Sequence, residues 1–176
     1  MKIAIMSDTH DHIANLRFAF AEIRKHGAEA IIHCGDFVSP FMVEEIASLG
    51  LPVFGVFGNN DGDRVKLVKN ASECGVPFIF HSDVARFKLD ICRIAATHFM
   101  ETAEDLAASG LYDLVCFGHT HRFYEKKIGT CLLLNPGEMM GKKEEISFCI
   151  FDTASGESIR IPLPTPHVYD KERSWA

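Results

Sequence analysis

Acidic, amide and imidazole side chains recur at the ends of short apolar runs along this chain. They occur in the segments SDTH (7–10), HCGD (33–36), GNND (58–61), ATH (96–98) and GHTH (118–121). Together these segments provide seven candidate metal ligands, namely Asp8, His10, Asp36, Asn59, His98, His119 and His121. Such a mixture of oxygen and nitrogen donors suits Mn, Fe, Ni or Zn better than Mg or Ca. Seven donors are too many for one ordinary ion, so we expect two divalent transition metal ions that share one carboxylate.

Two of these segments place candidate ligands two residues apart, as Asp8 with His10 and His119 with His121. In extended backbone, residues two apart point to the same side, so each pair could converge on one spot. Any one of these motifs by itself is more often a turn or a helix cap; Asp8, for example, could cap a following helix. The joint occurrence of five such motifs, each after an apolar run, is what indicates a metal site.

The first half of the chain alternates between strand-like and helix-like segments. Strands are predicted over Lys2–Ser7, Ala30–His33 and Val53–Phe57, and helices over His12–Lys25 and Phe41–Leu49. This β-α-β-α-β order is typical of right-handed crossovers in a largely parallel sheet. Because ligands bind beyond the carboxyl ends of strands in such sheets, the polar segments stand where a site is expected.

The second half is richer in strands. We predict a hairpin over Val84–Leu89 and Ile91–Ala96, a helix over Glu101–Ser109 and a buried strand over Leu114–Phe117. Four further strands are expected to form a meander, over Phe123–Ile128, Thr130–Leu134, Ile146–Phe151 and Ser158–Leu163. We interpret residues 1–163 as a single domain and residues 164–176 as a polar C-terminal tail.

Composition narrows the class of protein. The net charge of −6 argues against a protein with nucleic acid as a structural partner. The apolar runs are too short for a membrane span or a signal peptide. The six cysteines lie mostly inside apolar runs without any C-x-x-C pair, which predicts buried free thiols and a reducing compartment. We therefore expect a cytoplasmic protein.

The motif set resembles that of the calcineurin-like metallophosphoesterase superfamily, whose blocks run D-x-H, G-D, G-N-H-D/E, a lone H and G-H-x-H. The match extends from Met1 to about Pro162. The compact length and the Asn135-Pro136-Gly137 segment are similar to the small phosphodiesterase branch. The resemblance implies an α/β fold, a four-layer α/β/β/α sandwich of two mixed β-sheets flanked by helices. It also implies a homo-oligomer, either a dimer or a larger assembly.

The resemblance further implies a role for each ligand. Asp8, His10 and His121 would hold the first ion, Asp36 would bridge, and Asn59, His98 and His119 would hold the second. Mn is the most expected metal, with Ni, Fe or Zn as alternatives. The implied reaction is hydrolysis of a small phosphodiester by attack of a metal-bridging hydroxide. Asp36 and Asn59 would be catalytic through the ions, Asn60 would be a further catalytic residue, and Asn60 and His98 would contact the substrate.

Asn60 departs from the superfamily pattern, which often has a histidine there to protonate the leaving oxygen. An amide has no useful acidity near pH 7, and Phe99 and Met100, which follow His98, provide no replacement. His12, two residues beyond a ligand, remains a candidate proton donor. A missing general acid typically costs about 10²–10⁴-fold, so we predict a preference for good leaving groups such as aryl esters.

Other histidines and acids near the motifs are expected to be structural. His33 and His81 are interpreted as ordinary buried or surface histidines, and Asp61 is expected to orient the Asn59 loop rather than act as an acid. The alternative function is a non-catalytic protein-binding scaffold of the same fold, like the retromer subunit. The complete ligand set favours the enzyme, because a scaffold has no physical need for it. A metal store or sensor is a third alternative.

Overall fold

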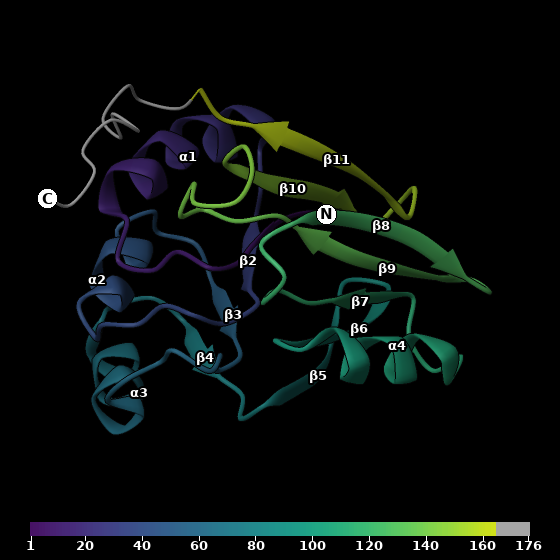
Figure 1. The fold of residues 1–176 in the computed structure, drawn as a ribbon, viewed down its shortest axis with the longest axis horizontal. Coiled ribbons are helices and arrows are strands. Elements are labelled where there is room, and N and C mark those ends of the chain that lie inside the picture. The colour runs from purple at the N-terminus through teal and green to yellow at the C-terminus, as the bar shows by residue number, and fades with distance from the viewer. Residues whose placement is uncertain (165–176) are drawn as a thin grey trace, which may run out of the picture.

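Six strands form one β-sheet, and helices connect the parallel strands within it (Figure 1). The structure is a computed structural model that describes residues 1–164. The strands of this sheet are β1 (Lys2–Met6), β2 (Ala30–His33), β3 (Val53–Gly55), β4 (Phe78–Phe80), β10 (Ser147–Asp152) and β11 (Glu157–Pro162). They lie in the order β11-β10-β1-β2-β3-β4. β1 to β4 run parallel, connected by α1 (Ile13–His26), α2 (Met42–Ala47) and α3 (Arg64–Glu73). The predicted β-α-β-α-β half is confirmed.

Five strands form the second sheet, with order β5-β6-β7-β9-β8. These strands are β5 (Val84–Leu89), β6 (Cys92–Thr97), β7 (Leu114–Cys116), β8 (Phe123–Ile128) and β9 (Cys131–Pro136). β6, β7 and β9 run parallel, and the hairpins β5–β6 and β8–β9 are antiparallel. One helix, α4 (Met100–Ala108), connects β6 to β7. Both sheets are therefore mixed, as predicted.

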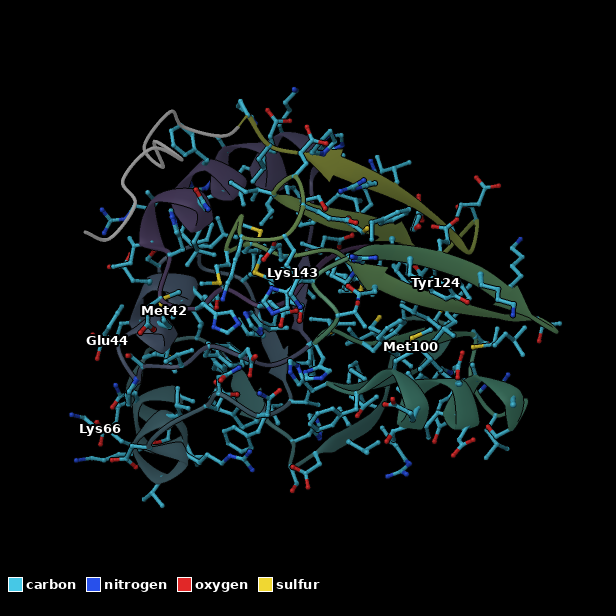
Figure 2. All side chains as sticks on the ribbon, in the orientation of Figure 1. Met42, Glu44, Lys66, Met100, Tyr124 and Lys143 are labelled. Carbon is cyan, nitrogen blue, oxygen red and sulfur yellow. The ribbon has the colours of Figure 1, made fainter. Side chains whose placement is uncertain are left out.

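Three apolar clusters hold the layers together. The cluster between the two sheets includes Ile5 and Ile32 from one sheet and Ile94 and Leu134 from the other. A second cluster joins α1, α2 and α3 to the six-stranded sheet, and a third joins α4 to the five-stranded sheet. Figure 2 shows Glu44 and Lys66 on the outer side of α2 and α3, away from these clusters. The predicted four-layer α/β/β/α sandwich is confirmed.

The six cysteines are free thiols, as predicted, and five of them are buried. Cys34, Cys92, Cys116 and Cys149 belong to the cluster between the sheets. They pack there as small apolar side chains, and burial raises the pKa of the Cys116 and Cys149 thiols. Within residues 1–164, the structure contains no helix with the length and apolar character needed to span a membrane.

The predicted four-stranded meander is wrong. The strands form two separate hairpins, β8–β9 in the five-stranded sheet and β10–β11 in the six-stranded sheet. The segment between β9 and β10 therefore crosses from one sheet to the other. Local alternation of apolar residues identifies a strand but not its partner, because partner choice depends on packing with distant segments.

Helix α3 and strand β4 were not predicted from the sequence. On α3, Val65 and Val68 are exposed and only Leu67 and Ala71 are buried, so the apolar residues do not mark the buried face. The helix begins after Asp63, whose side chain caps it by accepting a hydrogen bond from the Lys66 N–H at 2.9 Å. β4 has three residues, which is too short for a periodic pattern. Except for Pro164, the predicted tail lies outside the described residues.

Candidate metal centre

The candidate ligands follow strands that lie next to one another in the two sheets. Asp8 and His10 follow β1, Asp36 follows β2, Asn59 follows β3, His98 follows β6, and His119 and His121 follow β7. Neighbouring parallel strands end at the same edge of a sheet. The two edges meet, because the backbone N–H of His119 donates to Asp8 Oδ2 at 3.2 Å. All seven predicted ligands are therefore brought together.

Five of the seven candidate ligands have a left-handed rather than an extended backbone. The φ angles are 54° for Asp8, 41° for His10, 61° for Asp36, 65° for His119 and 61° for His121. The expectation that extended backbone aligns each i, i+2 pair is therefore wrong; tight turns after the strands direct these side chains. Each such non-glycine residue costs about 1 kcal/mol or more, and strain of this kind clusters at functional sites.

Glycines next to the ligands leave room for their side chains. A Cβ added to Gly58 would overlap the carboxylate of Asp36, and one added to Gly118 would overlap the Ser7 hydroxyl. A Cβ on Gly35 would lie 2.7 Å from His98 Nδ1. The glycines therefore permit the close approach of neighbouring segments on which the site depends.

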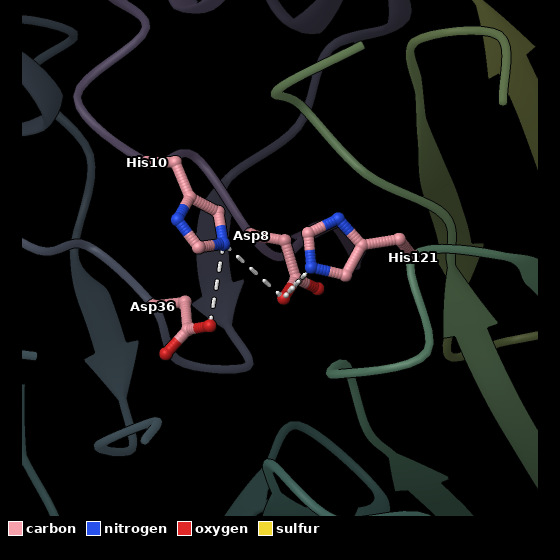
Figure 3. Close-up of side chains that lie close together, drawn as sticks. All are labelled: Asp8, His10, Asp36 and His121. Atoms are coloured by element: carbon pink, nitrogen blue, oxygen red, sulfur yellow. Dashed lines mark ion pairs between the residues drawn. The ribbon is translucent and has the colours of Figure 1, made fainter. Parts of the chain in front are cut away.

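One group of ligand atoms comes from Asp8, His10, Asp36 and His121, which all lie within 4.8 Å of one another (Figure 3). Nε2 of His10 lies 3.3 Å from Asp36 Oδ2 and 4.0 Å from Asp8 Oδ1. Nε2 of His121 lies 3.4 Å from Asp8 Oδ1. Two carboxylates and two imidazoles thus face a common point.

A second group lies on the other side of Asp36. Asn59 Oδ1 lies 3.0 Å from His98 Nε2 and 2.9 Å from His119 Nδ1. His98 Nε2 also lies 3.4 Å from Asp36 Oδ2. The same oxygen of Asp36 therefore faces His10 in the first group and His98 in the second, which is the position that a shared carboxylate needs.

Several atoms of this centre are buried without a hydrogen-bond partner among the described residues. They include Asp8 Oδ1, His10 Nε2 and the Ser7 hydroxyl oxygen. A buried carboxylate oxygen without a partner carries a large desolvation penalty. A cation bound by Asp8 and His10 would remove that penalty, so the donor set fits a divalent metal ion.

The two aspartates differ in their electrostatic environment. Burial raises the pKa of Asp8, although the neighbouring Ser7 side chain and the nearby histidines act to lower it. Burial also acts to raise the pKa of Asp36, but the close imidazoles of His10 and His98 and the hydrogen bonds from Asn60 outweigh it and hold that pKa well below its usual range. Asp36 is therefore stable as a carboxylate, whereas the partners of Asp8 do not offset the effect of its burial.

The remaining ring nitrogens of two candidate ligands have acceptors that the sequence did not identify. His98 Nδ1 lies 2.7 Å from the carbonyl oxygen of Cys34, and His121 Nδ1 lies 2.6 Å from Glu138 Oε2. Glu138 is completely buried. Sequence reasoning missed it because it follows Asn135-Pro136-Gly137 outside the five motifs; a charged residue directly after a buried strand was the available signal.

The other predicted site residues occupy defined positions near the ligands. Asn60 donates to both oxygens of Asp36, from its backbone N–H at 2.8 Å and its side-chain amide at 2.7 Å. His12 caps α1, and its Nδ1 accepts the N–H of Asn15 at 3.3 Å. The catalytic roles given to Asn60 and His12 and the substrate contact of His98, whose ring is completely buried, stay predictions.

The residues expected to be structural are in structural contacts. Asp61 accepts backbone N–H groups of Asp36, Val38 and Gly58, so it holds the Asn59 loop against the loop after β2, as expected. His33 is buried and stacks on Phe37 at 3.7 Å. His81 stacks on Phe87 at 5.5 Å.

Comparison with known proteins identifies the family. The sequence model of the calcineurin-like phosphoesterase superfamily domain matches residues 1–156. The chain belongs to the calcineurin-like phosphoesterase superfamily. Among relatives of this phosphoesterase, the phosphodiesterase MJ0936 of Methanocaldococcus jannaschii is 38% identical over 166 residues, which cover 93% of this chain and 99% of the relative. The predicted family and its small phosphodiesterase branch are confirmed.

Solved structures of other proteins agree with the fold. A structure described as a novel archaeal phosphodiesterase superposes with a TM-score of 0.87 at 37% identity, covering 93% of this chain and 100% of that chain. Vps29 of Entamoeba histolytica, solved in complex with Zn²⁺, superposes with a TM-score of 0.66 at 15% identity, covering 92% of this chain and 99% of that chain. At that identity, the second likeness concerns the fold alone.

Proposed function

We propose that this protein is a phosphodiesterase that uses two divalent metal ions to hydrolyse small phosphodiesters. Its membership of the phosphoesterase superfamily and its 38% identity to a phosphodiesterase over most of the chain support the reaction class. The observation that carries the proposal is the convergence of six donor side chains on two sides of a seventh, the buried carboxylate of Asp36.

Each ion would have its own ligands. Asp8, His10 and His121 would hold one ion, Asn59, His98 and His119 the other, and Asp36 would be shared. Mn is the metal that we expect first, with Ni, Fe or Zn as alternatives, because the donors mix carboxylate, amide and imidazole. Bound here, a pair of divalent ions would supply a nucleophilic hydroxide at neutral pH and stabilise negative charge on the phosphoryl oxygens.

Residues of the chain itself would then orient the reacting groups. Asn60 holds both oxygens of Asp36, and the Cys34 carbonyl and Glu138 hold the rings of His98 and His121. Such fixed partners support a rigid site whose donors need no rearrangement during the reaction. The lowered pKa of Asp36 supports its role as a permanent carboxylate.

A preference for aryl leaving groups has two sources of support. The amide of Asn60 is not acidic near pH 7 and cannot protonate a leaving group, so leaving groups that depart unprotonated would be favoured. In addition, the ring of Phe99 is 37% exposed and packs against His98 at 5.1 Å and against His119 at 5.0 Å, between centroids. An aromatic surface beside the ligands could stack an aryl group.

We further propose a cytoplasmic protein that forms a dimer or larger homo-oligomer and has no nucleic acid as a structural partner. Free, mostly buried thiols support a reducing compartment. The net charge of −6 supports the absence of a basic nucleic-acid surface. Sedimentation of the purified protein measures the oligomeric state.

The activity test compares wild type with Asp36→Ala and with Asp105→Ala, which removes an exposed carboxylate on α4. Hydrolysis of a bis-aryl phosphate is measured with added Mn²⁺ or Ni²⁺, and bound metal is measured by elemental analysis. We expect two ions per chain and activity in wild type and Asp105→Ala, with at least a 100-fold loss in Asp36→Ala. Two bound ions without turnover in any variant would instead favour the scaffold.

A further inference from the structure

Glu138 joins a candidate ligand to the loop between β9 and β10. Its side chain is completely buried. One carboxylate oxygen, Oε2, lies 2.6 Å from Nδ1 of His121. The other, Oε1, accepts the backbone N–H of Glu144 at 2.8 Å and that of Lys143. Figure 2 labels Lys143 in this loop. One oxygen of this carboxylate therefore accepts hydrogen bonds from the loop, and the other faces the His121 ring.

These contacts define which nitrogen of His121 carries the hydrogen. An ionised carboxylate only accepts hydrogen bonds, so Nδ1 of His121 must be the protonated nitrogen of the neutral ring. Nε2 then has its lone pair free, and it lies on the side of Asp8 Oδ1, at 3.4 Å. The opposite tautomer would direct an N–H at that point and could not bind a cation there.

We propose that Glu138 is a positioning residue that holds His121 in the Nδ1–H tautomer and so raises the affinity of the site for its metal ion. This inference rests on the proposed metal centre. The effect acts through His121, because a carboxylate acceptor fixes both the orientation and the basicity of an imidazole ligand.

A purely structural role predicts something different. If Glu138 served only to hold the loop between β9 and β10, its removal would loosen that loop and leave the tautomer of His121 unchanged. The state of the His121 ring therefore separates the two roles. It can be measured by ¹⁵N NMR on metal-free protein, without reference to activity.

Two variants and one matched control form the test. Glu138→Gln has the same shape, but a single amide oxygen cannot accept from both His121 and the loop, so one donor faces its NH₂ group. Glu138→Ala removes the acceptor entirely. Glu145→Gln makes the same change of charge at an exposed position of the same loop. Thermal melting in chelator confirms that each variant is folded.

Mn²⁺ affinity is measured by calorimetric titration. We expect a loss of about 10–100-fold in Glu138→Gln and Glu138→Ala, and a change of less than about threefold in Glu145→Gln. We also expect a single Nδ1–H tautomer of His121 in wild type and a mixture in Glu138→Ala. The inference is overturned if Glu138→Gln binds Mn²⁺ within threefold of wild type, or if the tautomer is unchanged in Glu138→Ala. Absence of Mn²⁺ binding in wild type would instead defeat the proposed function, while the tautomer measurement would still decide the role of Glu138.

Discussion

Asn60 holds Asp36 in place, and its amide side chain is not acidic near pH 7. Its backbone N–H and its amide each donate to one oxygen of the Asp36 carboxylate. Replacing the amide therefore has two consequences, since it removes one of those hydrogen bonds and changes the acidity at position 60. A pair of substitutions separates them.

Asn60→His supplies a group that can donate a proton near pH 7, whereas Asn60→Ala only removes the amide. We expect Asn60→His to raise turnover of an alkyl phosphodiester relative to a bis-aryl phosphate by at least tenfold. Asn60→Ala should lower turnover of both substrates by a similar factor, through the lost bond to Asp36. Steady-state kinetics with both esters measures this, and an equal effect of Asn60→His on the two esters would contradict the prediction.

His33 has a pKa of about 3, because burial opposes its charge. Its contacts suit the neutral ring, since Nδ1 accepts the Gly35 N–H at 3.2 Å and Nε2 lies 3.2 Å from the Thr9 hydroxyl. In an unfolded chain histidine has a pKa of about 6.5. Between these pH values the unfolded chain binds a proton that the folded protein does not, so stability falls as pH falls below about 6.5.

We expect this group to lower the free energy of unfolding by up to about 1.4 kcal/mol for each pH unit below 6.5, and to have no effect on the slope above it. His33→Gln removes the titration and should flatten the profile between pH 6 and 4. Urea unfolding in chelator measures both proteins without a contribution from bound metal. Parallel profiles for the two proteins would show that His33 is not the cause.

The turns after the strands, rather than the strands themselves, set the geometry of the site. The strands bring five chain segments to one place, and left-handed residues then direct the ligands. Asp61 contributes by accepting two backbone N–H groups of the turn after β2 and one of its own turn after β3, which joins the two turns. These turns must approach closely, which is why Gly58 has no room for a side chain.

Gly58→Ala should disrupt this approach. Its Cβ would overlap the Asp36 carboxylate, so the two turns would have to separate. We expect at least a tenfold loss of Mn²⁺ affinity, with about 1–3 kcal/mol of lost stability. Gly62→Ala is the matched control, since its Cβ would meet the Val38 carbonyl oxygen at 3.4 Å, which is close to ordinary contact. Calorimetric titration of both variants measures the difference, and equal affinities would contradict the argument.

The site lies where the two sheets meet, and each sheet provides part of it. Asp8, Asp36 and Asn59 follow strands of the six-stranded sheet, and the three histidines His98, His119 and His121 follow strands of the five-stranded sheet. Metal bound between them would join the two halves of the molecule. Because the unfolded chain does not hold these groups together, binding would stabilise the fold.

Metal removal should therefore lower the melting temperature. At a free metal concentration 100 times its Kd, one bound ion stabilises by about 2.7 kcal/mol, and about 2–4 °C per kcal/mol is usual for a protein of this size. We expect chelator to lower the Tm by about 5–10 °C or more in wild type and by much less in Asp36→Ala. Differential scanning calorimetry with and without chelator measures the shift. A wild-type Tm that does not respond to metal would argue against a site between the sheets.

Much of the chemistry was readable in short segments of the chain. Apolar runs closed by SDTH, HCGD, GNND, ATH and GHTH identify the candidate ligands, since both the strand and its polar end are encoded within a few residues. The alternation of helix and strand in the first half was readable for the same reason. Short or weakly patterned elements could not be predicted from the sequence, as α3 and β4 demonstrate.

Contacts between distant segments could not be derived in this way. His119 donates to Asp8 across 111 positions, and His121 meets Glu138 through a chain reversal between β8 and β9. The division of the last four strands between two sheets depends in the same way on which faces pack together. Local sequence encodes conformational preference, but the pairing of segments follows from the packing free energy of the whole chain, which no short segment contains.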